Sequence, residues 1–247
     1  MKKFELTTEQ KINWFGRTLY RIKACISFTT TSGDEVKAGD LGGFVEKESN
    51  LSHDGKAWVW GNAEVYGNAK VYGNAEVWGN AKVWGNAKVW GNAEVYGNAK
   101  VCGDAEVYGN AKVCGDAEVW GNAEVCGDAS VFSTEHIFCV TPIGEYANSL
   151  TLFRTKHLEI KISFEYELYS VEEFKKVIDE WDDTKNREVA LAVLEIGQKH
   201  IDLTPTSDDL KPCPFCGGEA EYNADSDIVV CTNCCASADK KIWNKRV

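Results

Sequence analysis

The sequence predicts a mainly β fold built around a parallel β-helix, and two observations lead to this prediction. A six-residue repeat fills the centre of the chain, and two Cys-x-x-Cys pairs lie near its C-terminal end. We expect four parts: an N-terminal β cap (residues 1–54), the β-helix (55–144), a small α/β unit (145–209) and a metal-binding segment (210–247). At 247 residues the chain is long enough for several units with cores of their own.

The repeat reads Gly-Asn/Asp-Ala-x-Val-x twelve times from Gly61 to Phe132, and a looser copy, residues 55–60, precedes it in register. A period of six is neither helical nor a simple strand alternation, but it suits a short strand followed by a tight corner. Ala and Val would point inward and fill a narrow prism with no room for a ligand. Gly-Asn would turn the corner, because Gly, Asn and Asp enter the left-handed region most readily. Three such sides close a coil of about 18 residues, and the coils stack about 4.8 Å apart.

The spacing of Val and the following Ala, four positions apart, resembles the hexapeptide-repeat family. The resemblance implies a left-handed parallel β-helix, and many members of that family are acyltransferases. Those enzymes typically interrupt their coils with a loop and supply a catalytic His, whereas residues 55–132 contain neither. We therefore expect a protein without enzyme activity, and a hexapeptide-type acyltransferase is the alternative.

The outward residue after each Val is aromatic or Cys, and a coil of 18 residues sorts these positions into three columns. The columns are Trp60, Trp78, Tyr96, Cys114 and Phe132; Tyr66, Trp84, Cys102 and Trp120; and Tyr72, Trp90, Tyr108 and Cys126. Such ladders serve either as a binding platform or as stabilising cross-strand pairs. We favour stabilisation, because the aromatic residues occupy every face and a binding site normally occupies one. The three Cys lie on different faces, so we expect free thiols.

Both ends of the β-helix need caps. In the N-terminal cap, residues 19–24 and 35–37 read as strands and residues 39–43 as a turn. Residues 16–22, 39–46 and 50–52 are similar to the leader of hexapeptide-repeat proteins that are common in prophages and bacterial genomes.

After the repeat we expect strands over residues 150–154 and 158–167 and helices over 171–181 and 187–200. Ser170 would be the N-cap of the first helix, with Glu173 at its third position. The acidic run 179–183 reads as an exposed helix end, and His157 and His200 read as structural or incidental residues.

Cys213, Cys216, Cys231 and Cys234 form two Cys-x-x-Cys pairs separated by fourteen residues. This spacing predicts a zinc ribbon, because tetrahedral zinc takes four thiolates from two tight turns. We expect one structural Zn2+ per chain, a turn at Gly217 and Gly218, and strands over residues 219–222 and 227–230. Cys235 is a spare neighbour that could replace Cys234 as a ligand.

The zinc ribbon also resembles the Lar family of restriction alleviation proteins. The matching residues are Leu210 to Ala220, the second Cys-x-x-Cys and Trp243 to Arg246. Cys235 stands where that family usually has Gly. Lar-type proteins are prophage or phage products that blunt host type I restriction.

The formal net charge of −11 is not offset by any strongly basic segment, so we expect no direct nucleic-acid binding. No apolar run approaches the ~20 residues of a membrane span, and the first residues do not resemble a signal peptide. These features favour the cytoplasm of a bacterial host.

We expect a phage or prophage protein that inhibits a bacterial defence system, with restriction as the first suspect. It would act by protein docking or by acidic DNA mimicry on a host defence protein, with nucleic-acid-handling proteins among the candidates. A homo-oligomer is compatible with the sequence. A structural protein that polymerises through its ends or its aromatic faces is a further alternative.

Overall fold

The computed structural model describes residues 2–144, 146, 148–205, 210, 213, 215–216, 218–223, 228–239 and 243. The chain forms two compact units: Met1–Thr155 with Ile160–Ile201, and Asp202–Val247 with Lys156–Glu159. The fold is mainly β, with two α-helices in the described part of the chain.

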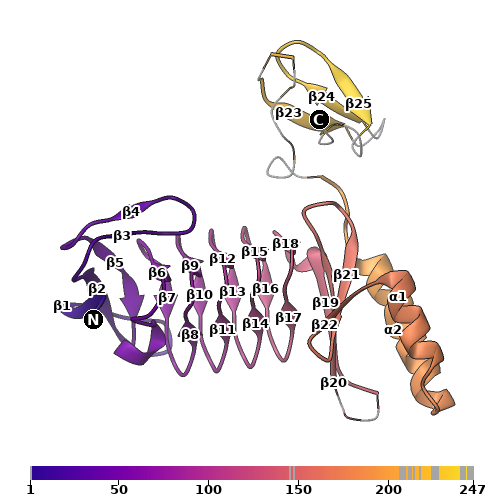
Figure 1. The fold of residues 1–247 in the computed structure, drawn as a ribbon, viewed down its shortest axis with the longest axis horizontal. Coiled ribbons are helices and arrows are strands. Elements are labelled where there is room, and N and C mark those ends of the chain that lie inside the picture. The colour runs from indigo at the N-terminus through magenta and orange to yellow at the C-terminus, as the bar shows by residue number, and fades with distance from the viewer. Residues whose placement is uncertain are drawn as a thin grey trace. The chain divides into compact units, whose positions relative to one another are not determined.

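The first unit is built on a parallel β-solenoid of about five turns, in which two-residue strands stack in three sheets (Figure 1). Each strand pairs with the strand 18 residues later, as Lys82 does with Lys100 and Val83 with Val101. This register confirms the predicted coil of 18 residues and the three outward columns. The strands are β6 (Trp58–Val59), β7 (Glu64–Val65), β8 (Lys70–Val71), β9 (Glu76–Val77), β10 (Lys82–Val83), β11 (Lys88–Val89), β12 (Glu94–Val95), β13 (Lys100–Val101), β14 (Glu106–Val107), β15 (Lys112–Val113), β16 (Glu118–Val119), β17 (Glu124–Val125) and β18 (Ser130–Val131).

The repeat Ala and Val side chains fill the interior of the solenoid, as predicted. From Ala57 to Val131 none of them is more than 1% exposed. Their burial supplies the hydrophobic stabilisation of the coils, because each methyl and isopropyl group is withdrawn from water.

The corners depend on glycine, with φ between +54° and +74° from Gly61 to Gly127. A Cβ on Gly85 would lie 2.9 Å from the backbone N of Gly103, so close stacking also excludes a side chain there. The expectation that Asn and Asp adopt the left-handed conformation at these corners is wrong, since none of them has a positive φ. Instead their side chains form ladders from coil to coil, as in the bond from Asn68 Nδ2 to Asn86 Oδ1 (3.1 Å).

The outward rings stack along their columns at one-coil spacing. Tyr72 and Trp90 lie 5.5 Å apart between ring centroids, and Trp90 and Tyr108 lie 4.5 Å apart, both nearly parallel. The charged strand positions pair across coils in the same way, as in the ion pair of Lys100 with Glu118 at 2.7 Å. These contacts support the stabilising role predicted for the ladders.

The N-terminal cap extends one solenoid sheet. Its strands are β1 (Phe4–Ile12), β2 (Thr18–Ala24) and β5 (Leu41–Val45), and β3 (Phe28–Thr29) with β4 (Glu35–Val36) forms a small separate sheet. β5 pairs in parallel with β7, which gives the seven-stranded order β1-β2-β5-β7-β10-β13-β16. The predicted turn over 39–43 is therefore wrong for its second half. Gly42 and Gly43 serve close packing instead, since a Cβ on either would lie 2.6 Å from Ile22 or Val59 atoms.

Polar side chains complete the first coil. Its outward-facing backbone carbonyls lack a preceding coil, and in one sheet the N–H groups of Phe44 and Glu46 in β5 and its C-terminal flank bond to them. In the other two sheets the buried Lys3 donates from Nζ to Ala57 O (2.8 Å), and the buried Asn50 donates from Nδ2 to Ala69 O (2.8 Å). Next to Asn50, the N–H of Ser52 donates to Val71 O (2.9 Å). Both side chains thus satisfy carbonyls that no strand of a preceding coil covers.

An antiparallel sheet closes the C-terminal end of the solenoid. It consists of β19 (Ile137–Ile143), β20 (Asn148–Arg154), β21 (Ile160–Phe164) and β22 (Glu167–Ser170). Thr151 Oγ1 accepts from the N–H of Glu124, and the buried Arg154 donates to Ser130 O. The strand predicted over 158–167 is split, because Glu165 and Tyr166 have positive φ and form a turn.

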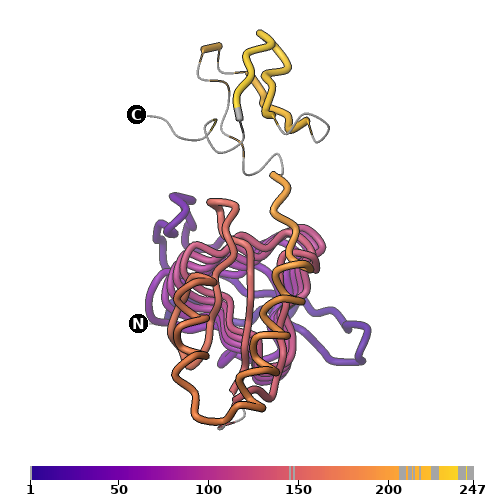
Figure 2. Tube along the Cα trace, turned by 90° about the vertical axis from the view of Figure 1, so that its right-hand side faces the viewer, coloured from indigo at the N-terminus to yellow at the C-terminus, as the bar shows by residue number. Residues whose placement is uncertain are grey.

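Two helices, α1 (Val171–Asp179) and α2 (Thr184–His200), pack on the sheet, as Figure 2 shows from that end of the solenoid. The predicted capping box of Ser170 and Glu173 is present at the start of α1. The helix ends differ from the prediction. Helix α1 stops at Asp179, and α2 begins three residues before the predicted start, with Asp183 as its N-cap. Within the described residues, no helix combines the length and the hydropathy that crossing a bilayer requires.

Candidate metal centre

Four of the five cysteines in the second unit lie on or beside a small antiparallel sheet. The sheet has the order β23 (Ala220–Asn223), β24 (Ile228–Cys231) and β25 (Ser237–Asp239). Cys213 and Cys216 precede β23, Cys231 ends β24, and Cys234 lies in the turn to β25. The third strand was not predicted, and β23 and β24 are each shifted by one residue from the predicted ranges. Asp227, at the start of one predicted strand, lies outside the described residues.

The four sulfur atoms converge, and all lie within 4.8 Å of one another. The Sγ atoms of Cys213 and Cys234 are 3.6 Å apart, and those of Cys216 and Cys231 are 3.5 Å apart. Tetrahedral coordination with metal–sulfur bonds of about 2.3 Å requires sulfurs about 3.8 Å apart. A disulfide requires about 2.05 Å, and all four cysteines are free. The geometry therefore fits a tetrathiolate metal site.

The two cysteine turns share one backbone arrangement. The N–H of Cys213 donates to Gly218 O (2.7 Å), and the N–H of Cys231 donates to Ala236 O (2.8 Å), five residues on in each case. Gly218 packs tightly between the turns, since a Cβ there would lie 2.7 Å from Asn233 Cβ. This close packing explains why position 218 of the predicted turn is a glycine. The other glycine of that turn, Gly217, lies outside the described residues.

Backbone N–H groups point at the sulfurs and favour the thiolate form. The N–H groups of Cys234 and Asn233 donate to Cys231 Sγ at 3.4 and 3.3 Å. The first of these bonds is the main cause that lowers the pKa of Cys231 to about 6. The N–H of Gly218 donates to Cys216 Sγ at 3.4 Å. Thiolates are the form that binds metal, so these donors prepare the site.

Cys235 is not one of the four converging cysteines. It is exposed and has a φ of +59°, a conformation that favours glycine. The alternative in which it replaces Cys234 is therefore not supported. Its backbone explains why Gly would suit this position, as in the Lar family.

The centre is linked to a small apolar core. Cys213, Val229, Cys231 and Trp243 are buried together, with Leu210 and Tyr222 packed at the edge. Trp243 was expected only as part of a motif, and in the structure it packs beside the cysteines. The remaining residues of that motif, 244–246, lie outside the described residues.

Within the described residues, these four cysteines are the one group of three or more Cys, His, Asp or Glu arranged to hold a metal. The other predicted positions lie apart from one another. Cys102, Cys114 and Cys126 follow strands of three different sheets, as expected, and His200 Nε2 donates to the carbonyl oxygen of Thr134 (3.0 Å). The acidic run ends α1 and caps α2.

Comparison with protein-family models and with curated proteins finds no match to this chain. The likenesses to hexapeptide-repeat and Lar-type proteins therefore rest on the motifs described above.

Proposed function

We propose that this chain is a non-enzymatic phage or prophage protein that inhibits a bacterial defence system by binding one of its components. The convergence of four thiolates in the second unit is the observation that carries the proposal. Four protein ligands fill a tetrahedral shell, which is typical of a structural metal and leaves no position for a substrate or an activated water.

The metal in this proposal is Zn2+. Thiolate ligands and tetrahedral geometry together favour zinc over hard cations such as Mg2+ or Ca2+. The apolar core beside the cysteines is small, so metal binding supplies folding free energy. Zinc ribbons of this kind dock on other proteins, and the exposed Phe215 between the first two cysteines offers an apolar contact.

Restriction is the first target of the proposal, because the Lar-like residues surround the metal centre. The partner is a host defence protein in the bacterial cytoplasm. Two binding modes compete: docking through the zinc ribbon, and mimicry of DNA by the acidic surface. Mimicry is supported by the charge of −11 and by the exposed Glu180 and Asp182 between the helices.

The test is phage plating on strains that carry individual restriction or other defence systems. Expression of the chain should raise the plating of unmodified phage on at least one such strain. Cys213→Ser with Cys216→Ser should abolish the effect if the ribbon docks, and Cys235→Ser is the matched control that should retain it. Glu180→Lys with Asp182→Lys should weaken the effect if mimicry operates, and binding should then fall as salt rises.

Unchanged plating across a broad panel of defence systems would remove the support for inhibition. Transfer of an acyl group from a coenzyme A thioester to any acceptor would establish the acyltransferase alternative instead.

A further inference from the structure

One face of the solenoid concentrates the exposed apolar side chains. Among residues 2–139, the large apolar side chains that remain exposed are Ile12, Trp14, Phe15, Leu41 and Trp120. Ile12 and Leu41 belong to strands of the seven-stranded sheet, Trp14 and Phe15 to the hairpin loop between two of its strands, and Trp120 directly follows β16. On the other two faces the aromatic ladders are half-buried or buried. Exposed apolar residues gathered on one face are typical of an interaction surface.

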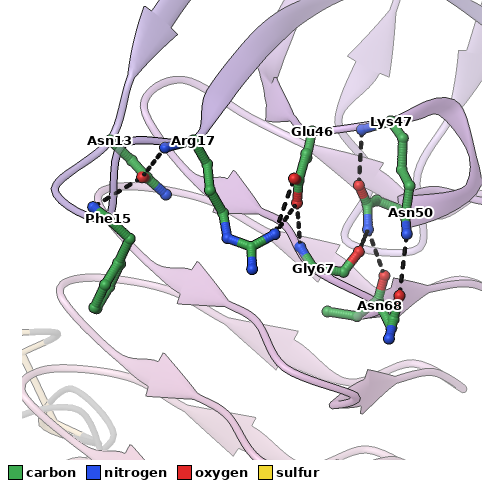
Figure 3. Close-up of polar contacts among 9 residues, drawn as sticks. Asn13, Phe15, Arg17, Glu46, Lys47, Asn50, Gly67 and Asn68 are labelled. Atoms are coloured by element: carbon green, nitrogen blue, oxygen red, sulfur yellow. Dashed lines mark hydrogen bonds and ion pairs between the residues drawn. The ribbon is translucent and has the colours of Figure 1, made fainter.

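The first part of this surface is the hairpin tip, residues 12–16, between β1 and β2. Trp14 is 93% exposed. The turn is closed by the side chain of Asn13, whose Oδ1 accepts from the N–H groups of Phe15 and Arg17, each at 3.0 Å (Figure 3). Arg17 in turn donates from one guanidinium nitrogen, Nη1, to both carboxylate oxygens of Glu46 (2.9 and 3.0 Å). The tip therefore presents its indole on an ordered turn, which lowers the entropic cost of binding.

The second part is a groove of about 380 Å3 at the other end of the same sheet. Its apolar walls are Trp120, Ala123, Ile137 and Phe138, and the polar side chains of Glu118, Thr134, Thr141 and His200 also line it. Trp120 is 67% exposed, unlike the half-buried Trp84 in its column. Its neighbour one coil earlier is Cys102, so no ring covers Trp120 from that side. A groove of this size suits one aromatic side chain and its neighbours.

The tip and the groove lie along one column. The Phe15 ring is 6.3 Å from that of Tyr66, and both line a cavity with Trp84. Tyr66 and Trp120 are 54 residues apart, which is three coils, or about 14 Å. Between them the strand residues Glu64, Lys82, Lys100 and Glu118 sum to zero formal charge and are paired within the chain. These four strand positions therefore do not repel a second acidic chain.

We propose that the occupant of the groove is the hairpin tip of a second copy of this chain. Two copies joined face to face and antiparallel place each tip in the groove of the other, so both contacts form at once and the assembly is a closed dimer. An uncharged aromatic tip and an apolar groove on the same chain are chemically complementary. The inference does not depend on the proposed function.

The mass of the zinc-loaded full chain in solution tests the proposal. Sedimentation or light scattering up to about 100 µM should show two chains of 27.4 kDa each, with a dissociation constant in the micromolar range or below. Trp14→Ser and Trp120→Ser should each weaken association at least about tenfold. Tyr166→Asn removes another exposed aromatic residue, in the β21–β22 turn, and should leave the dimer unchanged.

Mixing the two variants gives the sharper result. A dimer of Trp14→Ser chains and a dimer of Trp120→Ser chains each lack any complete tip–groove contact. A mixed dimer has one complete contact, so mixing should restore association. A monomeric wild-type chain, larger oligomers that grow with concentration, or no restoration on mixing would each overturn the proposal.

Discussion

Lys3 illustrates how a single charged residue closes the N-terminal end of the solenoid. Lys3 as a whole is 1% exposed, and its ammonium group donates to the carbonyls of Gly55 and Ala57. Burial lowers the pKa of Lys3 to about 8 from an ordinary value near 10.5, against an opposing effect of Asp54. Between these two pH values the unfolded chain binds more protons than the folded chain, so the free energy of unfolding rises with pH.

We therefore predict that the stability difference between wild type and Lys3→Met changes in favour of wild type as pH rises from 7.5 to 10. The change should be about 2 kcal/mol, and it should vanish below pH 7, where both states are protonated. Denaturant unfolding of both proteins across this range measures it. The paired comparison cancels the titration of tyrosines and cysteines. A constant difference would show that Lys3 is not held in a desolvated position.

Asn50 also donates hydrogen bonds to carbonyls of the first coil, but from a neutral group. Its substitutions distinguish the effect of losing the N–H donors from the effect of changing the side-chain volume. Its Nδ2 donates to Gly67 O and Ala69 O, and its Oδ1 accepts from the N–H of Lys47. We predict that Asn50→Ala costs about 2–4 kcal/mol. Asn50→Asp should cost more at neutral pH, because a carboxylate faces two carbonyls without a proton to donate.

Thermal and denaturant unfolding measure both Asn50 variants. Asn80→Ala, at an exposed corner of the solenoid, is the matched control and should cost less than about 1 kcal/mol. If Asn50→Asp were as stable as wild type, the assignment of the amide as the donor to Gly67 O and Ala69 O would be wrong.

At the scale of elements, the metal centre should determine whether β23, β24 and β25 form. We predict one zinc per chain in gently purified protein, loss of that zinc in Cys213→Ser, and its retention in Cys235→Ser. Chelation at neutral pH should remove amide-exchange protection from β23–β25 while β6–β18 keep theirs, because the solenoid has a core of its own. Elemental analysis measures the zinc content, and hydrogen exchange measures the protection of the strands. If the coils of the solenoid also lost protection after chelation, their folding would depend on the metal centre and the prediction would be wrong.

The elements differ in how far the sequence predicts them. The coils were predictable because Ala, Val and Gly recur every six residues, so local geometry and core packing demand the same residue at each position. Lys3, Asn50 and Arg154 were not, because each bonds to a carbonyl that lies 54, 19 or 24 residues away. Nothing in the local pattern marks such a partner.

The metal centre shows the same division. The spacing of Cys213, Cys216, Cys231 and Cys234 was sufficient to predict that their sulfurs meet. The N–H donors to the sulfurs and the third strand β25 follow from the fold of the turns, which spacing alone does not determine. Trp14 carried no periodic signal, and its exposure depends on the turn that Asn13 closes.

At the scale of the whole molecule, the repeat makes the length of the solenoid adjustable. Deletion of residues 79–96 removes one full coil, and deletion of residues 79–84 removes one third of a coil. We predict that both variants fold with similar melting temperatures, because each new junction joins one intact repeat to another. Circular dichroism with thermal unfolding checks this. Failure of the longer deletion to fold would show that a specific coil, and not the repeated pattern, stabilises the solenoid.

Because each coil has 18 residues, the number of repeats determines the angle around the solenoid axis between the parts that flank it. Each added or removed hexapeptide turns everything beyond it by about 120° around the solenoid axis, and only multiples of three return it to the same side. Nine repeats separate Tyr66 from Trp120, which keeps the hairpin tip and the groove in phase. The six-residue deletion should therefore turn them to different sides and yield a monomer, while the 18-residue deletion should still dimerise. A change in copy number can thus alter assembly without any change in the residues that make contact.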